Sequence, residues 1–232
     1  MTAQLRFNNV TLGYDRHPAV HHLIGEVNDG AMVAVVGPNG AGKSTLFKGI
    51  VGAIKPLSGR IDPPDGATFA GVMIGEPGDR CVVASDAGYG FVVKLEELYS
   101  RNRAGKAVLN VPEGAGVLIP VPVPEDAGAL LCAASNEGKL LVFPVGDLPE
   151  LARGKGNKIF GLSSKKVASR EEFLAAIAVV APGQNLLVWA GDRKMTLKFA
   201  DLADYRGERA QRGAVLPRGW RKVERLEAES TA

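Results

Sequence analysis

Cysteine, histidine and aromatic residues are scarce in this chain of 232 residues, which holds 2 Cys, 3 His and 6% Phe, Trp and Tyr. Two cysteines, Cys81 and Cys132, cannot build a disulfide framework or a zinc site. No apolar run reaches the ~18 residues that a membrane-spanning helix needs. The sequence also shows no basic segment followed by an apolar stretch at its start, so no signal peptide is visible. These absences predict a cytoplasmic protein without membrane-spanning helices.

Glycine and proline are plentiful instead, with 29 and 14 residues, which favours turn-rich structure over a helical bundle. The charge is uneven along the chain. Residues 151–232 hold 16 of the 28 Lys and Arg but only 9 of the 25 Asp and Glu, a net charge of +7, whereas the rest of the chain carries −4. A local excess of positive charge indicates either a polyanionic partner or a solvated face.

The first sixty residues contain a phosphate-binding pattern. Residues 5–14 alternate as a strand does, and residues 31–36 (AMVAVV) form an apolar run typical of a buried parallel strand. The pattern Gly-x4-Gly-Lys-Ser follows at 37–44, and residues 46–54 predict a helix that Pro56 ends. Glycines in such a loop let backbone N–H groups point at phosphate oxygens, and the helix N-terminus adds its positive dipole.

The side chains of this Walker A pattern define its chemistry. Lys43 would reach the outer phosphates and Ser44 would bind Mg²⁺. With Tyr14 in the place of an aromatic residue that stacks on adenine, the first sixty residues resemble the start of an ATP-binding-cassette (ABC) transporter ATPase. The resemblance implies ATP and Mg²⁺ as ligands and a membrane permease as partner. The nucleotide-binding residues that it implies are Tyr14, Gly37, Asn39, Gly40, Gly42, Lys43, Ser44 and Thr45.

The ABC resemblance stops early. The family has a Leu-Ser-Gly-Gly-Gln signature, an apolar strand that ends in Asp-Glu and a later switch histidine. Here residues 57–60 (LSGR) form a turn after the first helix, and His17, His21 and His22 all precede the phosphate loop. Without these groups nothing would activate water, so the sequence does not predict ATP hydrolysis by this chain.

A cluster of Pro, Gly and Asp at 56–66 separates this segment from the rest of the chain. We place the boundary so that residues 1–60 form a short, incomplete α/β P-loop segment and residues 61–232 a second domain. Beyond the cluster, Gly, Asn and Asp turns separate short apolar runs, and only 170–180 predicts a helix, with Ser169 as its N-cap. This pattern predicts a mainly β fold. The expected strands are 81–84, 90–93, 107–109, 117–119, 130–133, 140–143 and 186–189.

The β-rich part repeats with a period near 50. Ala84-Ser85 recurs as Ala134-Ser135, Gly88 as Gly138, Val92 as Val142 and Leu98 as Leu148, and a third copy begins at Ala190 with a one-residue slip in its turn. Each copy ends in a basic, glycine-bearing stretch. A period near 50 with about four strands per unit predicts a bladed β-structure. The basic stretches are 103–106 (RAGK), 153–156 (RGKG) and 209–213 (RAQRG).

Five stretches of the β-rich part carry a resemblance to a known family: 84–92 (ASDAGYGFV), 101–107 (RNRAGKA), 143–149 (FPVGDLP), 154–159 (GKGNKI) and 218–225 (RGWRKVER). Through them, residues from about 56 to 228 resemble the C-terminal part of the A subunit of DNA topoisomerase IV, which is a bacterial type II topoisomerase. The resemblance implies a β-pinwheel, a disc of blades that binds duplex DNA on a basic rim and presents it to the catalytic part of the enzyme. It implies no cofactor for the DNA-binding part.

Two features depart from that family. About three blades can be counted, fewer than the family's disc has, so the sequence predicts a partial β-pinwheel. The domain with the catalytic tyrosine is absent, since none of Tyr14, Tyr89, Tyr99 or Tyr205 lies in the nucleophile motif, and Tyr89 and Tyr99 are interpreted as packing or turn residues. The sequence therefore predicts a chain that binds DNA without cutting it.

The predicted rim would act through phosphate contacts. Lys and Arg on loops between blades neutralise phosphates and release counterions, which positions DNA without reading its sequence. For each residue the alternative is a solvated surface charge. The candidate DNA-binding residues are Arg101, Arg103, Lys106, Arg153, Lys155, Lys158, Arg193, Lys194, Lys198, Arg209 and Arg212.

Four other residues are interpreted as structural. Cys81 and Cys132 lie in apolar runs and are expected to be buried thiols. Trp189 is expected in the core because it ends an apolar run, and Trp220 is expected to pack against a blade.

The two resemblances meet at residues 56–61 (PLSGRI), which fit both families. The sequence therefore favours a fusion of two parts over a genuine two-domain protein, because neither part is complete. Two functions follow, a sequence-independent DNA-binding module and a nucleotide site of ABC type that needs another chain to complete it.

Overall fold

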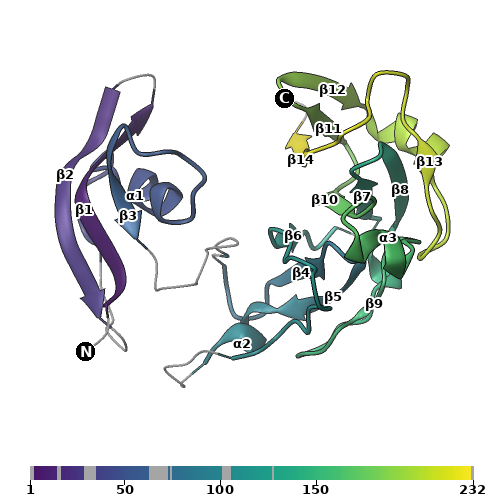
Figure 1. The fold of residues 1–232 in the computed structure, drawn as a ribbon, viewed down its shortest axis with the longest axis horizontal. Helices are drawn as coiled ribbons and strands as arrows, with labels where there is room; N and C mark the ends of the chain where they lie inside the picture. The colour runs from purple at the N-terminus through teal and green to yellow at the C-terminus, as the bar shows by residue number, and fades with distance from the viewer. Residues whose placement is uncertain are drawn as a thin grey trace. The chain divides into compact units, whose positions relative to one another are not determined.

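The computed structural model describes residues 3–14, 17–28, 35–62, 73, 75–100, 106–126 and 128–230. The described residues up to Asp62 form one compact unit, and those from Met73 form another. Both units are built mainly of strands (Figure 1). Among the described residues, no helix is long and apolar enough to cross a membrane.

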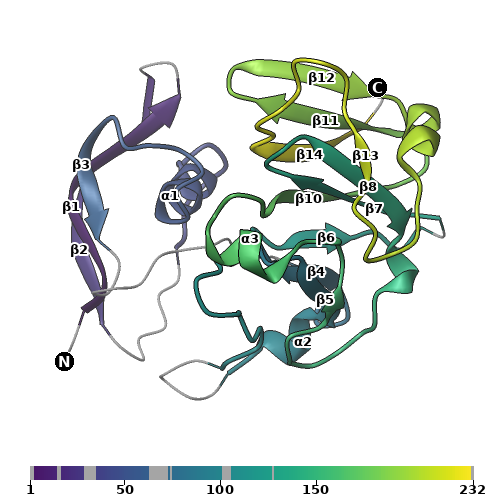
Figure 2. The same ribbon diagram turned by 45° about the vertical axis from the view of Figure 1, so that its right-hand side comes forward.

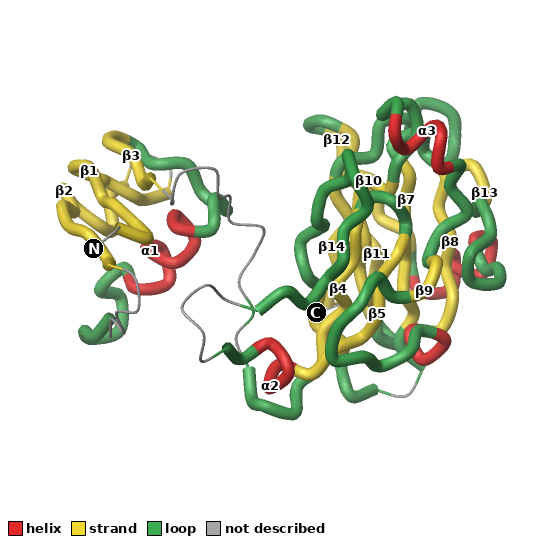
Figure 3. The backbone as a smooth tube through the Cα atoms, turned by 60° about the horizontal axis from the view of Figure 1, so that its bottom comes forward, coloured by secondary structure: helices red, strands yellow, loops and turns green. Residues whose placement is uncertain are grey.

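The first unit is a small antiparallel sheet with one helix. Its strands pair in the order β2-β1-β3, and α1 lies against the sheet (Figure 3). Phe7, Val10 and Leu12 of β1 are buried there, and a Cβ at Gly49 of α1 would meet the Leu12 side chain. The close approach of helix and strand therefore depends on glycine. The elements are β1 (Ala3–Tyr14), β2 (His17–Asn28), α1 (Lys43–Ile50) and β3 (Ser58–Asp62).

The sequence predicts part of this unit correctly. The strand expected at 5–14 is confirmed as part of β1, and the expected helix is present but starts at Lys43 and ends at Ile50. The buried parallel strand expected at 31–36 is wrong in its described part, because Val36 belongs to no strand and is 86% exposed. Residues 31–34 lie outside the described residues.

The second unit contains three successive antiparallel sheets, which we call blades 1, 2 and 3 (Figure 2). Blade 1 has the order β6-β4-β5-β9, blade 2 the order β10-β7-β8-β13 and blade 3 the order β12-β11-β14. The strands of blade 1 are β4 (Arg80–Ser85), β5 (Tyr89–Lys94), β6 (Val121–Val123) and β9 (Asn157–Lys158). Those of blade 2 are β7 (Leu130–Ser135), β8 (Lys139–Pro144), β10 (Leu174–Val180) and β13 (Ala214–Val215). Those of blade 3 are β11 (Gln184–Ala190), β12 (Arg193–Leu197) and β14 (Arg225–Ser230). Short helices connect them, namely α2 (Leu95–Leu98), η1 (Val145–Asp147), α3 (Ser164–Ala168) and η2 (Phe199–Tyr205).

Blades 1 and 2 each receive their short outer strand from the segment that follows the hairpin of the next blade. The short outer strand β9 follows the hairpin of blade 2 but pairs with β5 of blade 1, and β13 follows the hairpin of blade 3 but pairs with β8 of blade 2. The exchange uses equivalent hydrogen bonds: the Ile159 N–H donates to the Gly88 carbonyl at 2.7 Å, and the Leu216 N–H donates to the Gly138 carbonyl at 2.9 Å. The repeat of period 50 is thus a repeat of structure, and the mainly β, bladed fold class is confirmed.

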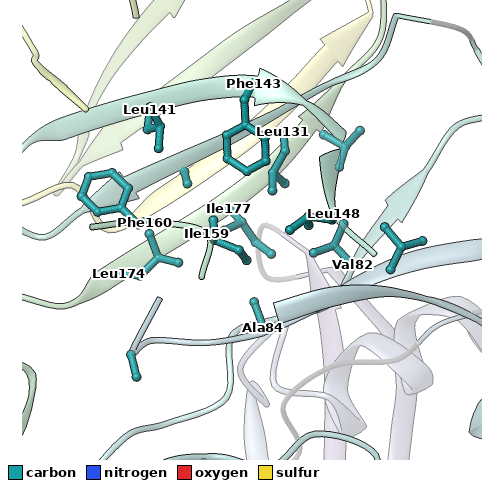
Figure 4. Packing of buried hydrophobic residues seen from close by; sticks show 14 of the residues in the cluster. Val82, Ala84, Leu131, Leu141, Phe143, Leu148, Ile159, Phe160, Leu174 and Ile177 are labelled. Carbon is teal, nitrogen blue, oxygen red and sulfur yellow. The ribbon is translucent and has the colours of Figure 1, made fainter. Parts of the chain in front are cut away.

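The core lies between the blades. Side chains alternate along a strand, so Leu131 and Ala133 of β7 pack toward blade 1, whereas Leu130 and Cys132 pack toward blade 3. Blade 2 is therefore buried on both faces, which explains its continuous apolar strands. The cluster between blades 1 and 2, with Phe143 among its members, is seen in Figure 4.

Several predicted elements of this unit are wrong. The helix expected at 170–180 is strand β10 over Leu174–Val180, and a short helix, α3, precedes it. Pairing with β7 over Leu130–Ser135 overrides the helix propensity of its alanines. Residues 107–109 and 117–119 form isolated bridges in place of strands.

Candidate functional site

Two of the three basic stretches, 153–156 and 209–213, directly precede the short outer strands of blades 1 and 2. Gly156 and Gly213 immediately precede β9 and β13, with φ angles of 75° and 70°. A Cβ at Gly156 would overlap the Gly90 carbonyl, and one at Gly213 would overlap the Leu140 carbonyl. Glycine is therefore needed where the chain passes this close to the hairpin, and the residues before these glycines occupy equivalent places in successive blades. Those residues are Lys155 in blade 1 and Arg212 in blade 2.

Lys155 is held against an aromatic ring. Its Nζ lies 3.9 Å from the centroid of the Tyr89 ring, at the start of β5. This cation–π contact leaves the Lys155 side chain exposed while limiting its rotamers. Tyr89 thus supports the basic edge of blade 1, in agreement with the packing role expected for it.

Two basic stretches lie side by side, namely 209–213 and the stretch 153–156 extended by the two residues of β9, Asn157 and Lys158. Arg209 donates from Nη1 to the carbonyl of Lys158 at 2.8 Å, and the Lys158 Nζ donates to the carbonyl of Leu162 at 3.2 Å. Main-chain bonds reinforce the contact, from Ala210 N–H to the Ile159 carbonyl at 3.0 Å and from Gly161 N–H to the Gln211 carbonyl at 2.8 Å. The structure therefore brings Lys158 and Arg209 together from segments about fifty residues apart.

Arg212 lies over a buried carboxylate. Its Nη2 donates to Oε2 of Glu172 at 2.6 Å, and Lys139 Nζ donates to Oε1 at 2.7 Å. Lys166 Nζ lies 3.6 Å from Oε2. Burial by itself would raise the pKa of Glu172, but the hydrogen bonds and positive charges of Lys139 and Arg212 outweigh it and lower the pKa below its ordinary value. Glu172 is therefore an anion at neutral pH.

Blade 3 carries a separate basic group. Arg193 donates to the carbonyl of Gly219 and lies 5.2 Å from the Trp220 ring centroid. Lys194 and Arg225 lie 5.8 and 4.4 Å from the ring centroid of Trp189.

Of the positions predicted for the two tryptophans, one is wrong and one is confirmed. The core position predicted for Trp189 is wrong, because its side chain is only partly buried and its Nε1 donates to Glu227 at 3.0 Å. Packing of Trp220 against a blade is confirmed.

The other candidates lie elsewhere. Lys106 Nζ lies 3.7 Å from the Glu97 carboxylate. Arg153 is exposed two residues before Lys155, and Lys198 is exposed at the start of η2. Arg101 and Arg103 lie outside the described residues.

Sequence reasoning misses several basic residues of this surface. Lys139 opens β8 at the place that Tyr89 has in β5, and Lys166 lies in α3. Arg170 donates to Asp86 at 2.7 Å and lies 4.1 Å from the Phe173 ring centroid. An alignment of the repeats points to Lys139. Arg170 depends on a contact with a segment 84 residues earlier in the chain, and Lys166 depends on the burial of Glu172, six residues after it.

The phosphate loop belongs to the first unit. Ala19 and residues 39–45 line a hollow at the N-terminus of α1, where Gly42 has a φ of 78°. Lys43 Nζ donates to the carbonyls of Gly37 and Pro38 at 2.7 and 2.8 Å, so it spans the loop. A left-handed glycine at a helix N-terminus with a lysine across it fits a phosphate group.

The remaining predicted residues of this site are placed around the same helix. Ser44 is exposed at the start of α1 and would hold Mg²⁺ together with a phosphate, whereas Thr45 is buried. Tyr14 is 45% exposed, and Lys48 Nζ lies 5.5 Å from its ring centroid. Among the described residues, no group of three or more His, Cys, Asp or Glu gathers as a metal site.

The cysteines are buried and free, as expected. Burial raises the pKa of Cys81 to about 11 and that of Cys132 further. Since the thiolate is the nucleophile, neither thiol is suited to covalent catalysis.

Two family models match the chain. The model of the DNA gyrase C-terminal domain, a beta-propeller, matches residues 79–122 and 129–181. The ABC transporter model matches residues 20–89. The first match covers most of blades 1 and 2, and the second includes the phosphate loop.

Known relatives resemble the bladed unit. The A subunit of DNA topoisomerase 4 from Pseudomonas aeruginosa is 50% identical over 172 residues, which is 74% of this chain. Its counterpart from Escherichia coli K12 is 42% identical over 176 residues, which is 76% of this chain. The chain spans only 23% of the length of either relative.

Solved structures show the same likeness. The E. coli ParC C-terminal domain superposes with a TM-score of 0.65 and 41% identity, over 72% of this chain and 67% of that domain. The DNA gyrase A C-terminal domain superposes with a TM-score of 0.54 and 13% identity, over 79% of this chain and 58% of that one. The second likeness shows a shared fold only.

Proposed function

The chain belongs to the family of ParC-type C-terminal domains of DNA topoisomerase IV, and we propose that its residues 73–230 bind duplex DNA without sequence preference. Binding uses the cationic outer edges of the blades. The DNA held there is positioned for strand passage by the remaining topoisomerase IV subunits, in the cytoplasm. The chain itself cuts no DNA and needs no cofactor for binding.

The observation that carries this proposal is the contact between the basic stretches of blades 1 and 2. The bond from Arg209 to the Lys158 carbonyl places two cationic segments next to each other. Lys155 and Arg212 extend them at equivalent outer strands. Cations spaced along an edge suit the phosphates of a duplex, which carries one charge per ~1.7 Å of its axis.

Sequence-independent binding is tested with two duplexes of equal length and unrelated sequence. The full chain is titrated against each labelled duplex, and anisotropy gives the dissociation constants. We expect equal affinities, because phosphate contacts carry no sequence information. A preference of ~10-fold or more for one duplex would indicate base contacts and contradict the proposal.

A second candidate function is nucleotide binding at the phosphate loop, with Mg²⁺ at Ser44. The loop geometry around Lys43 and the ABC family match support it. Bound nucleotide would need a partner chain, such as one associated with a permease, to complete the site. Equilibrium binding of Mg-ATP that Lys43→Ala abolishes, while DNA binding is retained, would establish this site. Equal binding of Mg-ATP by the Lys43→Ala chain would exclude it.

A further inference from the structure

One carboxylate gathers three cations on blade 2. The side chain of Glu172 is fully buried. Its Oε1 lies 2.7 Å from Lys139 Nζ, and its Oε2 lies 2.6 Å from Arg212 Nη2 and 3.6 Å from Lys166 Nζ. The cations come from three separate segments: β8, the stretch before β13 and helix α3. Glu172 therefore fixes where these segments place their positive charges.

The three cations are not buried with their partner. The side chains of Lys139, Lys166 and Arg212 are 20%, 41% and 56% exposed, whereas that of Glu172 is 0% exposed. One negative charge, that of Glu172, faces three positive ones. Glu137, whose carboxylate lies 3.5 Å from Lys139 Nζ, neutralises one further positive charge. The surface above Glu172 thus keeps an excess of positive charge.

The corresponding place in blade 1 is built differently. There Lys155, the equivalent of Arg212, is steadied by the Tyr89 ring at 3.9 Å. In blade 2, Lys139 stands where Tyr89 stands in blade 1, and no ring supports Arg212 from that position. Glu172 takes over the support by an ionic contact, so both blades hold a cation at the same outer strand.

We propose that Glu172 is a positioning residue that orients Lys139, Lys166 and Arg212 to receive a DNA phosphate at the outer edge of blade 2. The proposal rests on the proposed DNA-binding function. Long cationic side chains lose conformational freedom when they bind, and a buried anion that holds them beforehand reduces that cost. The anion itself is buried beneath the cations, so it repels phosphate less than an exposed carboxylate would.

The direction in which one substitution changes the affinity for DNA distinguishes a positioning role from simple electrostatics. Glu172→Gln removes one negative charge and so raises the net charge of the chain by one, and electrostatics alone therefore predicts tighter binding to DNA. Positioning predicts weaker binding, because the cations lose their common anchor. Glu171→Gln is the matched control: Glu171 is the exposed neighbour, and its Oε1 accepts a bond from Ser169 rather than from these cations.

The experiment measures binding of the full chain and both variants to one labelled duplex over a series of salt concentrations. We expect Glu172→Gln to bind roughly 3–10-fold more weakly than the wild type, with a salt slope smaller by about one for each phosphate that the cations no longer reach. Glu171→Gln should bind equally or slightly more tightly. Glu172→Gln binding as tightly as Glu171→Gln would overturn the positioning role. If the wild-type chain does not bind the duplex at all, the proposed DNA-binding function itself is wrong.

A charge-preserving variant covers the case in which Glu172→Gln does not fold. Arg212→Lys keeps the charge but loses the planar fork that bonds Glu172. If Glu172 positions the cations, Arg212→Lys weakens DNA binding at a temperature at which thermal melting shows the variant to be fully folded. Arg218→Lys, at an exposed arginine before β14, does not weaken it. Equal binding by these two variants would contradict the proposal.

Discussion

Arg209 donates a hydrogen bond from Nη1 to the main-chain carbonyl of Lys158, 2.8 Å away and 51 residues earlier in the chain. The bond ties the basic stretch that follows the hairpin of blade 2 to the one that follows the hairpin of blade 3. Each stretch contributes an outer strand to the preceding blade, so the bond joins two repeats at their cationic edge. A polyanion lying along this edge would meet both stretches at once.

Removing two cations from blade 1 should weaken DNA binding. Lys155→Ala with Lys158→Ala is expected to reduce the affinity for every duplex by the same factor and to lower the salt slope by about two, because each lysine is expected to contact a phosphate. Anisotropy titrations with unrelated duplexes check this. Lys48→Ala with Lys55→Ala, at two exposed lysines of the first unit, is the matched control and should leave affinity nearly unchanged. A weakening confined to one DNA sequence would argue for base reading.

The outer strands should depend on glycine. Gly156→Ala introduces a Cβ at a φ of 75° and against the Gly90 carbonyl, so we expect a loss of stability of about 2–4 kcal/mol from backbone strain and overlap. Gly146→Ala adds a Cβ into open space and serves as the control. Urea unfolding of both variants measures the difference. Equal stabilities would show that β9 does not need this close approach.

Stability should depend on the ionisation of Glu172. Its pKa is lower in the folded chain than in the unfolded one, so its contribution is fully present above the unfolded pKa of about 4.3 and is lost as the pH falls through the folded value. Glu172→Gln should therefore cost about 1–3 kcal/mol at pH 7. The difference in unfolding free energy from the wild type should narrow on acidification below about pH 4. Urea unfolding across pH tests this, and a difference that stays constant would contradict it.

The two thiols should resist modification. Burial raises the pKa of both Cys81 and Cys132, so little thiolate forms at about pH 8. A thiol-specific reagent should label neither residue in the folded chain and both in denaturant. Rapid labelling under native conditions would show that the strands β4 and β7 open readily.

The repeat allows much of the fold to be predicted. Turns at Gly88 and Gly138, fifty residues apart, define two hairpins, and the apolar strands on either side of them indicate a core shared by adjacent blades. The exchange of outer strands could not be predicted, because β9 and β13 are two residues long and carry no strand pattern of their own. Helix propensity misleads at Leu174–Val180, where pairing with β7 decides the structure.

The candidate site is predictable only in part. Charge and glycine in the basic stretches point to Lys155, Lys158 and Arg212. No local pattern indicates that Glu172 is buried beneath Arg212, because the two residues are 40 positions apart in the sequence. Their contact also depends on β13, which follows the hairpin of blade 3 but pairs with β8 of blade 2. Lys166 lies only six residues before Glu172, but it escapes prediction because its role depends on the burial of that carboxylate.

The most direct test is the salt dependence of duplex binding by the full chain. If several cations of the outer strands contact phosphates, the logarithm of the association constant should fall linearly with the logarithm of the salt concentration, with a slope of about −0.9 per phosphate. We expect a slope of about −4 or steeper between ~50 and ~200 mM salt. An affinity unchanged over this range, or no binding at the lowest salt, would contradict a phosphate-binding edge.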